Sequence, residues 1–347
     1  MTGARIGVDI GGTKMLGVRL GPDAFPEAEM KVGTPGDGRR AVEVVGRVVA
    51  ALTPSSGGSE PASVGVGIPG LVDSHDVLRF SPHLPDLVGL GLADHLLAEH
   101  PRARTWFGND ATAAGWAEHR LGAATDADEV VMVTLGTGIG GGLILGGRLA
   151  EGSHRFAGEF GHMVVDPHGP LCPCGKQGCW ERYASGSGLG LLGREAAVAG
   201  KAPRVIALAG GEAEAVRGEH VTLAAAEGDA AAVAIMGRFA WWLALGLANL
   251  ANIVDPAVIV VGGGLIDAGE VLMGPVRRAF ADLVEAGEQR GGVAIRPAAL
   301  GSRAGAVGAA LLADEAPSGG ALSPRSPWYR PRSESASGGG RAGRAPS

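Results

Sequence analysis

The alternation of apolar and polar stretches along the first half of the chain predicts strands alternating with helices. Residues 6–9 and 15–20 are short apolar stretches separated by a few glycine-rich residues, which is typical of a β-hairpin. Apolar residues recur at helical spacing through residues 38–52, and residues 110–121 form an alanine-rich stretch that favours a helix. Strands and helices that alternate through most of a chain indicate the α/β class.

The second half continues this alternation and adds one long helix. Strands are expected over residues 130–135, 142–145 and 258–261, and helices over residues 230–253 and 270–285. Asn249 and Asn252 interrupt the longest apolar run, residues 239–254. The run is therefore too short and too polar to span a bilayer, and we expect no membrane partner.

Glycine clusters follow the expected strands at three places, residues 11–12, 136–142 and 262–264. Glycine after a strand lets backbone N–H groups approach a phosphate closely. One such cluster is what any tight turn needs, whereas three in one α/β chain indicate a nucleotide held from several sides.

The known nucleotide motifs restrict how that nucleotide is bound. Residues 136–141 match Gly-x-Gly-x-x-Gly, but a strand-like stretch follows where a dinucleotide site needs a helix. The phosphate-loop pattern Gly-x-x-x-x-Gly-Lys-[Ser/Thr] does not occur in the sequence. A phosphate clamp formed by two glycine hairpins, at residues 9–14 and 135–138, is the remaining arrangement.

Composition narrows the class of protein further. A chain of 347 residues, 46% of them hydrophobic, is long enough for two domains. Its net charge of −6 argues against a nucleic-acid partner, because nucleic-acid-binding domains are usually basic. Residues 317–347 are mostly Ser, Gly, Pro and Arg and are expected to be a disordered tail. No signal peptide is visible before the first strand, which indicates a cytoplasmic protein.

The three cysteines lie within eight residues and suggest a metal site. With one upstream histidine they supply four ligands of the type that tetrahedral zinc prefers, namely His162, Cys172, Cys174 and Cys179. A closed site of four ligands would be structural. A redox-active Cys-x-Cys pair beside a surface histidine is the alternative. Glu159 and Glu181 flank the ligands, so a bound metal would also fix two carboxylates.

Asn109 and Asp110 lie where a strand, residues 105–107, meets the expected helix. Either residue is a good helix N-cap, and a carboxylate at this place is also a candidate general base. The local sequence does not decide between these roles.

Several motifs resemble those of the actin, Hsp70 and hexokinase superfamily. Asp9-Ile-Gly-Gly-Thr-Lys14 resembles its first phosphate motif, residues 135–142 its second, and residues 260–264 its adenosine motif. Residues 157–162, with the cysteine block and Glu181 after them, are similar to the signature of the ROK family, which contains bacterial ATP-dependent glucokinases. The similarity covers roughly residues 5–315.

This resemblance implies a two-domain, actin-like (ribonuclease H-like) α/β fold with a cleft between the domains. It implies a small domain of residues 1–118 with residues 301–316, and a large domain of residues 119–300 that carries the zinc-binding loop and the adenosine site. Closure of the two domains over sugar and ATP would exclude water from the reaction.

The resemblance also implies a role for each candidate residue. Asp110 is the expected general base for transfer of a phosphoryl group to a hexose hydroxyl. Sugar binding is expected from Gly70, Asn109, Asp110, Glu159, His162 and Glu181. ATP binding is expected from Asp9, Gly11, Gly12, Thr13, Lys14, Thr137, Gly138, Gly263 and Gly264. Mg²⁺ is expected to bridge the ATP phosphates and to reach Asp9 through water, and a structural Zn²⁺ is expected on the four ligands named above.

The substrate expected from the resemblance is glucose, with N-acetylmannosamine, N-acetylglucosamine, mannose, fructose and allose as alternatives. His83 stands where family members often carry asparagine, in a loop that borders the sugar pocket, so the sequence does not fix the sugar. A sugar-sensing regulator of the same family is disfavoured because the first phosphate motif starts at Asp9, which leaves no room for a DNA-binding domain before it. A nicotinamide-dependent oxidoreductase is the third possibility. We expect a homodimer or homotetramer.

Overall fold

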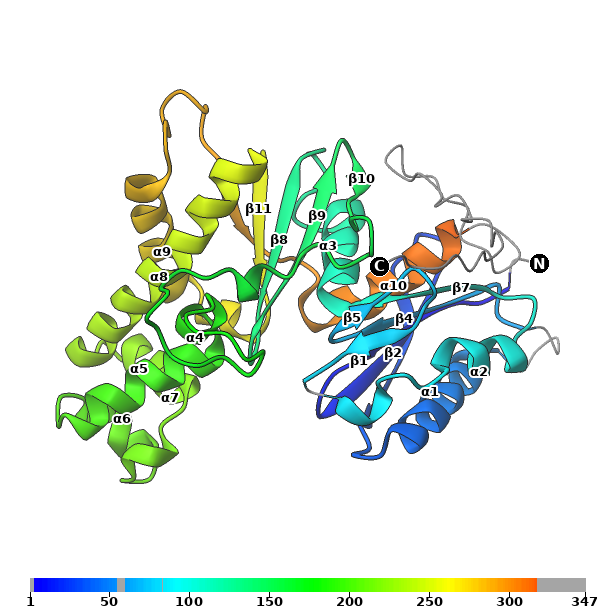
Figure 1. The fold of residues 1–347 in the computed structure, drawn as a ribbon, viewed down its shortest axis with the longest axis horizontal. Helices are drawn as coiled ribbons and strands as arrows, with labels where there is room; N and C mark the ends of the chain where they lie inside the picture. Colours follow the sequence, from blue (N-terminus) through cyan, green and yellow to red (C-terminus); the bar gives the residue numbers. More distant parts are fainter. Residues whose placement is uncertain (1–2, 55–59, 83, 317–347) are drawn as a thin grey trace, which may run out of the picture.

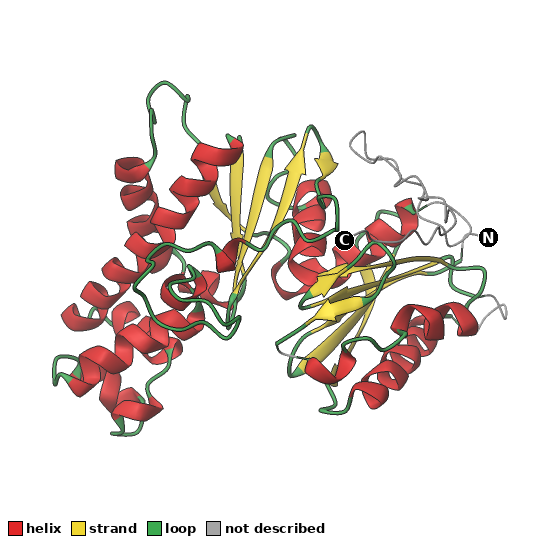
Figure 2. Ribbon diagram, in the orientation of Figure 1, coloured by secondary structure: helices red, strands yellow, loops and turns green. Residues whose placement is uncertain are grey.

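The computed structural model describes residues 3–54, 60–82 and 84–316, so His83 and the expected tail at 317–347 lie outside the described residues. Two lobes lie side by side, each built on a five-stranded sheet (Figure 1). Helices pack against the sheets of both lobes (Figure 2). The predicted α/β class is confirmed.

The first sheet has the strand order β3-β2-β1-β4-β7. Its strands are β1 (Arg5–Ile10), β2 (Lys14–Leu20), β3 (Pro26–Gly33), β4 (Ser63–Ile68) and β7 (Arg104–Asn109). β1 and β2 form the predicted antiparallel hairpin, and β4 and β7 run parallel to β1. A small hairpin of β5 (Leu71–Val72) and β6 (Leu78–Phe80) follows β4.

The second sheet has the order β10-β9-β8-β11-β12. Its strands are β8 (Val130–Leu135), β9 (Ile139–Leu145), β10 (Arg148–Leu149), β11 (Val258–Gly262) and β12 (Ala294–Pro297). β8 and β9 are antiparallel, whereas β11 and β12 run parallel to β8. β9 begins three residues earlier than the strand expected from the sequence.

The two sheets repeat one topology, although no repeat is visible in the sequence. Each begins with an antiparallel hairpin and continues with two strands parallel to the first. The glycine turns of the two hairpins, residues 11–13 and 136–138, therefore occupy equivalent places. This explains why similar glycine clusters recur far apart in the chain.

Helices cover the outer faces of both sheets and fill the space between them. α1 (Gly38–Leu52) and α2 (Leu92–Glu99) lie in the first lobe; the second holds α4 (Glu181–Ala184), α5 (Gly186–Val198), α6 (Pro203–Leu208), α7 (Gly218–Ala226), α8 (Ala230–Val254) and α9 (Glu270–Leu283). α3 (Asp110–Leu121) and α10 (Ala304–Glu315) share one hydrophobic core with both sheets. The chain thus returns to the first lobe at its C-terminal helix.

The division into residues 1–118 with 301–316 and residues 119–300 stays a proposal. Its first boundary falls inside α3, and α3 packs against β8 and β9 as well as against α10. The helix belongs to the junction of the lobes.

α8 is the one described helix that is long and apolar enough to cross a membrane by length and composition. It has 25 residues, so the expectation that this segment is too short is wrong. Half of its most apolar window is buried, and its inner face shares a core with β8 and β11. This placement is that of a core helix in an α/β lobe.

Glu118 of α3 ties the junction together. Its fully buried carboxylate accepts hydrogen bonds from the backbone N–H groups of Ala123, Ala299 and Leu300, at 2.8, 3.0 and 2.8 Å. These bonds hold the segment that leads from β12 into α10.

We expect Glu118→Ala to destabilise the protein by about 3 kcal/mol, because three buried backbone donors lose their acceptor. Urea unfolding followed by circular dichroism measures this change. Glu43→Ala, at an exposed position of α1, is the control and should stay within about 0.5 kcal/mol of the parent. Equal midpoints for the two variants would show that Glu118 does not stabilise the junction.

Candidate active site

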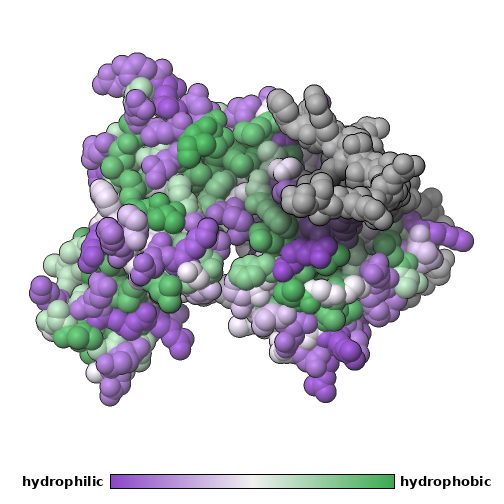
Figure 3. All heavy atoms as spheres, in the orientation of Figure 1, coloured by the Kyte–Doolittle hydropathy of each residue, from purple (hydrophilic) through white to green (hydrophobic). Residues whose placement is uncertain are grey.

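The parallel strands of both sheets direct their carboxyl ends at one cleft. Asp9, Gly70 and Asn109 lie at or just after the ends of β1, β4 and β7, and Gly136 and Gly263 follow β8 and β11. A cavity of about 490 Å³ lies where these ends meet. The surface is hollowed between the two lobes (Figure 3).

Most of the candidate residues line this cavity. They are Asp9, Gly11, Gly12, Thr13, Gly70, Asn109, Asp110, Thr137, Gly138, Glu159, His162, Glu181 and Gly263, with Cys174 of the metal candidates. Lys14 does not line it, and Gly264 lies in an adjoining cavity. The fold therefore brings together side chains that are up to about 250 residues apart in sequence.

Each glycine bend is closed by one backbone hydrogen bond. In the first, the N–H of Gly11 donates to the carbonyl of Lys14 at 2.9 Å; in the second, the N–H of Gly136 donates to the carbonyl of Gly138 at 3.0 Å. A Cβ atom at Gly138 would lie 2.5 Å from a carboxylate oxygen of Glu181. A side chain at Gly138 would displace that carboxylate from its place in the cavity.

Asp9 carries a buried carboxylate with an orphan oxygen. Its Oδ1 has no hydrogen-bond partner among the described residues, and no side chain at Gly67 separates it from Asp110. Burial, and secondly the negative charge of Asp110, raise the pKa of Asp9 to about 7, while Lys14 acts in the opposite direction. A buried acceptor of this kind suits a cation or its bound water.

The raised pKa makes the stability of the ligand-free protein depend on pH. Folding disfavours the ionised form of Asp9, so its contribution to stability is fully present below pH 4 and is lost as the pH rises to 7. We expect Asp9→Asn, which cannot ionise, to gain melting temperature relative to the parent as the pH rises from 4 to 7. Thermal melts between pH 4 and 7 measure the gap.

The control for this series is Asp282→Asn, at an exposed position of α9, which should follow the parent at every pH. A gap between Asp9→Asn and the parent that stays constant or shrinks with rising pH would contradict the assignment.

The strand-to-helix turn shows which of Asn109 and Asp110 caps helix α3. Asn109 is the N-cap of α3, since its Oδ1 accepts the N–H of Thr112 at 3.0 Å, and its Nδ2 donates to the carbonyl of Gly70 at 3.2 Å. Asp110 is the first helical residue, and its Oδ1 accepts the N–H of Ala111 at 2.9 Å. The cap is thus supplied by Asn109, and the carboxylate of Asp110 lines the cavity.

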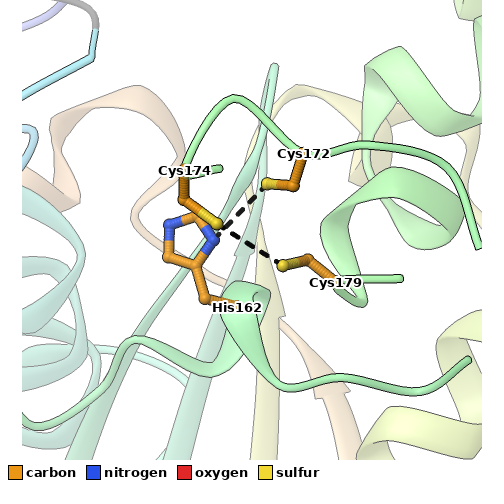
Figure 4. A group of neighbouring side chains, drawn as sticks. All are labelled: His162, Cys172, Cys174 and Cys179. Carbon is orange, nitrogen blue, oxygen red and sulfur yellow. Dashed lines mark hydrogen bonds between the residues drawn. The ribbon is translucent and has the colours of Figure 1, made fainter. Parts of the chain in front are cut away.

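The three thiols and the imidazole point toward one another (Figure 4). Their donor atoms all lie within 4.8 Å of one another, with 3.8 Å between Cys172 Sγ and His162 Nδ1 and 3.6 Å between the sulfurs of Cys174 and Cys179. Tetrahedral zinc with bonds of about 2.3 Å separates its sulfur ligands by about 3.8 Å. The four residues are therefore compatible with a tetrahedral zinc ion.

The cluster of His162 and the three cysteines borders the cavity through His162 and Cys174. His162 turns its Nδ1 to the thiols, while its Nε2 lies 3.8 Å from Glu159 Oε2. Glu181 Oε1 lies 3.0 Å from Cys172 Sγ and 3.6 Å from His162 Nδ1. Burial raises the pKa of Glu159. Both carboxylates are thus positioned by the loop that carries the ligands.

Residues 5–316 match the sequence model of the ROK family. The chain belongs to the ROK family. Glucokinase of Streptomyces coelicolor is 36% identical over 320 residues, which cover 90% of this chain and 98% of that protein. N-acetylmannosamine kinase of Escherichia fergusonii is 33% identical over 263 residues, or 75% of this chain and 82% of that kinase.

A crystal structure of a ROK family glucokinase from Streptomyces griseus, in complex with glucose and AMPPNP, superposes with a TM-score of 0.80. It is 39% identical in sequence and covers 90% of this chain and 100% of that one. The predicted family and actin-like fold are confirmed. The roles of the individual ROK site residues remain predictions.

Sequence reasoning missed several residues of the ROK site. Gly301 and Gly305 line the cavity at the start of α10, and they form a fourth glycine cluster that was visible in the sequence. Gly264 lies with Arg194, Arg217 and Asp267 around a second cavity of about 720 Å³, which shares Gly136 and Thr137 with the first. No sequence spacing connects these charged residues, because α5, α7 and the turn after β11 meet only in the fold.

Proposed function

We propose that this chain transfers the γ-phosphoryl group of ATP to hydroxyl 6 of glucose. The observation that carries the proposal is the convergence of two glycine bends, the Asp110 carboxylate and four polar side chains suited to sugar hydroxyls on one cavity between the lobes. The match to ROK glucokinases supports ATP and glucose as the substrates.

In this proposal the sugar binds against the walls that carry Asn109, Glu159, His162 and Glu181. The carboxylates accept hydrogen bonds from sugar hydroxyls. His162, whose Nδ1 would bind zinc, donates its Nε2–H to a hydroxyl oxygen, so groups on the two lobes fix the ring from opposite sides. Gly70 contributes through its backbone, whose carbonyl already holds the Asn109 amide. These contacts orient hydroxyl 6 toward Asp110.

The triphosphate lies across the bends at Gly11–Thr13 and Thr137–Gly138, whose backbone N–H groups donate to its oxygens. Asp110 takes the proton of hydroxyl 6 as the new O–P bond forms and the bond from the γ-phosphorus to the bridging oxygen of ADP breaks. The adenosine moiety occupies the second cavity beside Gly263 and Gly264. Lys14, exposed at the rim, lowers the pKa of Asp9.

Two metal ions complete the proposal. Mg²⁺, when bound, neutralises charge on the ATP phosphates, and the orphan oxygen of Asp9 favours that residue as its anchor through water. Zn²⁺ on His162, Cys172, Cys174 and Cys179 is structural, because four protein ligands leave no open position. Three reduced thiols favour the cytoplasm, and we retain a homodimer or homotetramer as the expected assembly.

A kinase for N-acetylmannosamine is the second candidate, favoured by the 33% identity to such an enzyme. The two functions differ at carbon 2 of the sugar, where the acetamido group needs additional room.

A sugar panel with ATP tests the proposal. Glucose, mannose, fructose, allose, N-acetylglucosamine and N-acetylmannosamine are each assayed for ADP release, and the products are identified by mass spectrometry. We expect the highest kcat/KM for glucose, with glucose 6-phosphate as product. Greater kcat/KM for N-acetylmannosamine would select the second candidate. Absence of any sugar-dependent ADP release would reject both.

A further inference from the structure

Arg155 lies in the loop between β10 and Glu159 and has an unusual backbone conformation. Its φ is +64°, in the left-handed region that favours glycine, and its side chain is only 9% exposed. The guanidinium lies 6.0 Å from the ring centre of Trp106. A charged side chain this deeply buried needs partners for its N–H groups.

Those partners come from both lobes. Arg155 Nε donates to Glu151 Oε1 at 3.0 Å within its own loop. Its Nη1 donates to Asp76 Oδ1 at 2.8 Å and to the carbonyl of Asp73 at 3.2 Å, both in the turn of the β5–β6 hairpin. Its Nη2 donates to the carbonyl of Phe107 in β7 at 2.7 Å. One side chain therefore bonds three segments of the chain.

Each of these segments leads directly to a residue of the proposed sugar site. The β5–β6 hairpin begins after Gly70, β7 ends at Asn109, and the loop of Arg155 continues through Gly158 to Glu159. Gly158 packs on β9, where an added Cβ would lie 2.5 Å from the carbonyl of Gly141. The hydrogen bonds of Arg155 to the β5–β6 hairpin and to β7, here called the clamp, thus fix the distance between the sugar-binding walls of the two lobes.

The partner Asp76 is also held in the left-handed region, with φ of +59°. Left-handed backbone at residues other than glycine persists where the surroundings dictate it, and such positions gather at functional sites. Arg155 and Asp76, two of the five described non-glycine residues with positive φ, pair with each other across the lobes.

We propose that Arg155 is a positioning residue that preassembles the sugar site by clamping the Glu159 loop to the β5–β6 hairpin and to β7. The inference rests on the proposed sugar kinase function. The sugar site lies next to the clamp, whereas the second glycine bend and the second cavity are formed by other segments. Loss of the clamp therefore affects the sugar more than ATP.

The test compares Arg155→Gly, Asp76→Asn and the double variant with the parent. Glycine adopts the φ of Arg155 without strain, so the first change removes the clamp and relieves the backbone. We expect the KM for the sugar to rise by about tenfold or more and the KM for ATP to change by less than about threefold, because misplaced binding groups lose orientation. The double variant should resemble Arg155→Gly, since both changes break one interaction.

Arg290→Gly is the matched control. Arg290 also joins two segments, donating to the carbonyls of Ala251 and Glu285 and pairing with Asp255, and it lines neither cavity. Its KM values should equal those of the parent. An unchanged sugar KM in Arg155→Gly, or an equal rise in the KM for sugar and the KM for ATP, would overturn the proposal. If Arg155→Gly does not fold, the same two KM values measured on Asp76→Asn decide the question in the same way.

Amide hydrogen exchange of residues 156–162 gives a readout that does not depend on activity. The clamp predicts faster exchange there in Arg155→Gly than in Arg290→Gly, and equal exchange would overturn it. If the parent phosphorylates no sugar, the proposed function fails while this readout still tests the clamp.

Discussion

Asp110→Asn is expected to lower kcat by a factor of about 10² to 10⁴, the range typical of a lost general base. The amide has the size of the carboxylate and can still accept the N–H of Ala111, which Asp110 Oδ1 accepts at 2.9 Å. The start of α3 and the sugar-binding groups around it should therefore stay in place. The sugar KM, measured in the same steady-state assay, is expected to change by only a few-fold.

Asp94→Asn is the control for the loss of a negative charge from the first turn of a helix. Asp94 also lies in the first turn of a helix, α2, and is exposed. A general effect of removing a carboxylate from a helix N-terminus would appear in both variants. If Asp110→Asn keeps more than about a tenth of the parent kcat, Asp110 is not the base, since even modest general-base catalysis exceeds that factor.

Removal of the metal is expected to have the second largest effect, on stability and on sugar binding together. Cys179 is fully buried and precedes Trp180, whose Nε1 donates to the carbonyl of Trp242 in α8 at 2.8 Å. The cluster thus anchors the core of the second lobe. We expect Cys179→Ala to lower the melting temperature by about 10 °C or more, because structural zinc contributes directly to folding.

Zinc content, melting temperature and sugar KM are measured on the same preparations. The parent should contain one zinc ion per chain and Cys179→Ala none. His168→Ala, an exposed histidine of the same loop, is the control and should match the parent in all three. If the parent protein, after a chelator has removed its metal, kept the melting temperature and sugar KM that it had before, the cluster would not be a structural metal site.

Local patterns in the sequence predicted much of the fold. The helix expected over residues 38–52 and the strand over residues 130–135 agree with α1 and β8 at both ends. The first segment has a clear helical period and the second is a short, almost continuous apolar run. The short strands β5 and β6 gave no signal, since two or three residues cannot show a period. The shared core of α3 and α10 was also beyond prediction, because it depends on contacts between residues almost 200 apart.

The candidate site divides in the same way. Residues that carry their chemistry in a local motif, such as the three cysteines and the glycine bends, were found from sequence. Arg155 was not, because its partners at Asp76 and Phe107 are 79 and 48 residues away and no spacing relates them. The role of Glu118 was hidden for the same reason. Two of the N–H groups that its carboxylate accepts, those of Ala299 and Leu300, lie 181 and 182 positions further along the chain.

The most direct test of the account is a crystal structure of the protein with glucose and AMPPNP bound together. The account predicts that hydroxyl 6 lies within hydrogen-bond distance of Asp110 and points at a γ-phosphate held between the bends at residues 11–13 and 136–138. A sugar bound with hydroxyl 6 turned away from Asp110, or a triphosphate that touches only one bend, would contradict it.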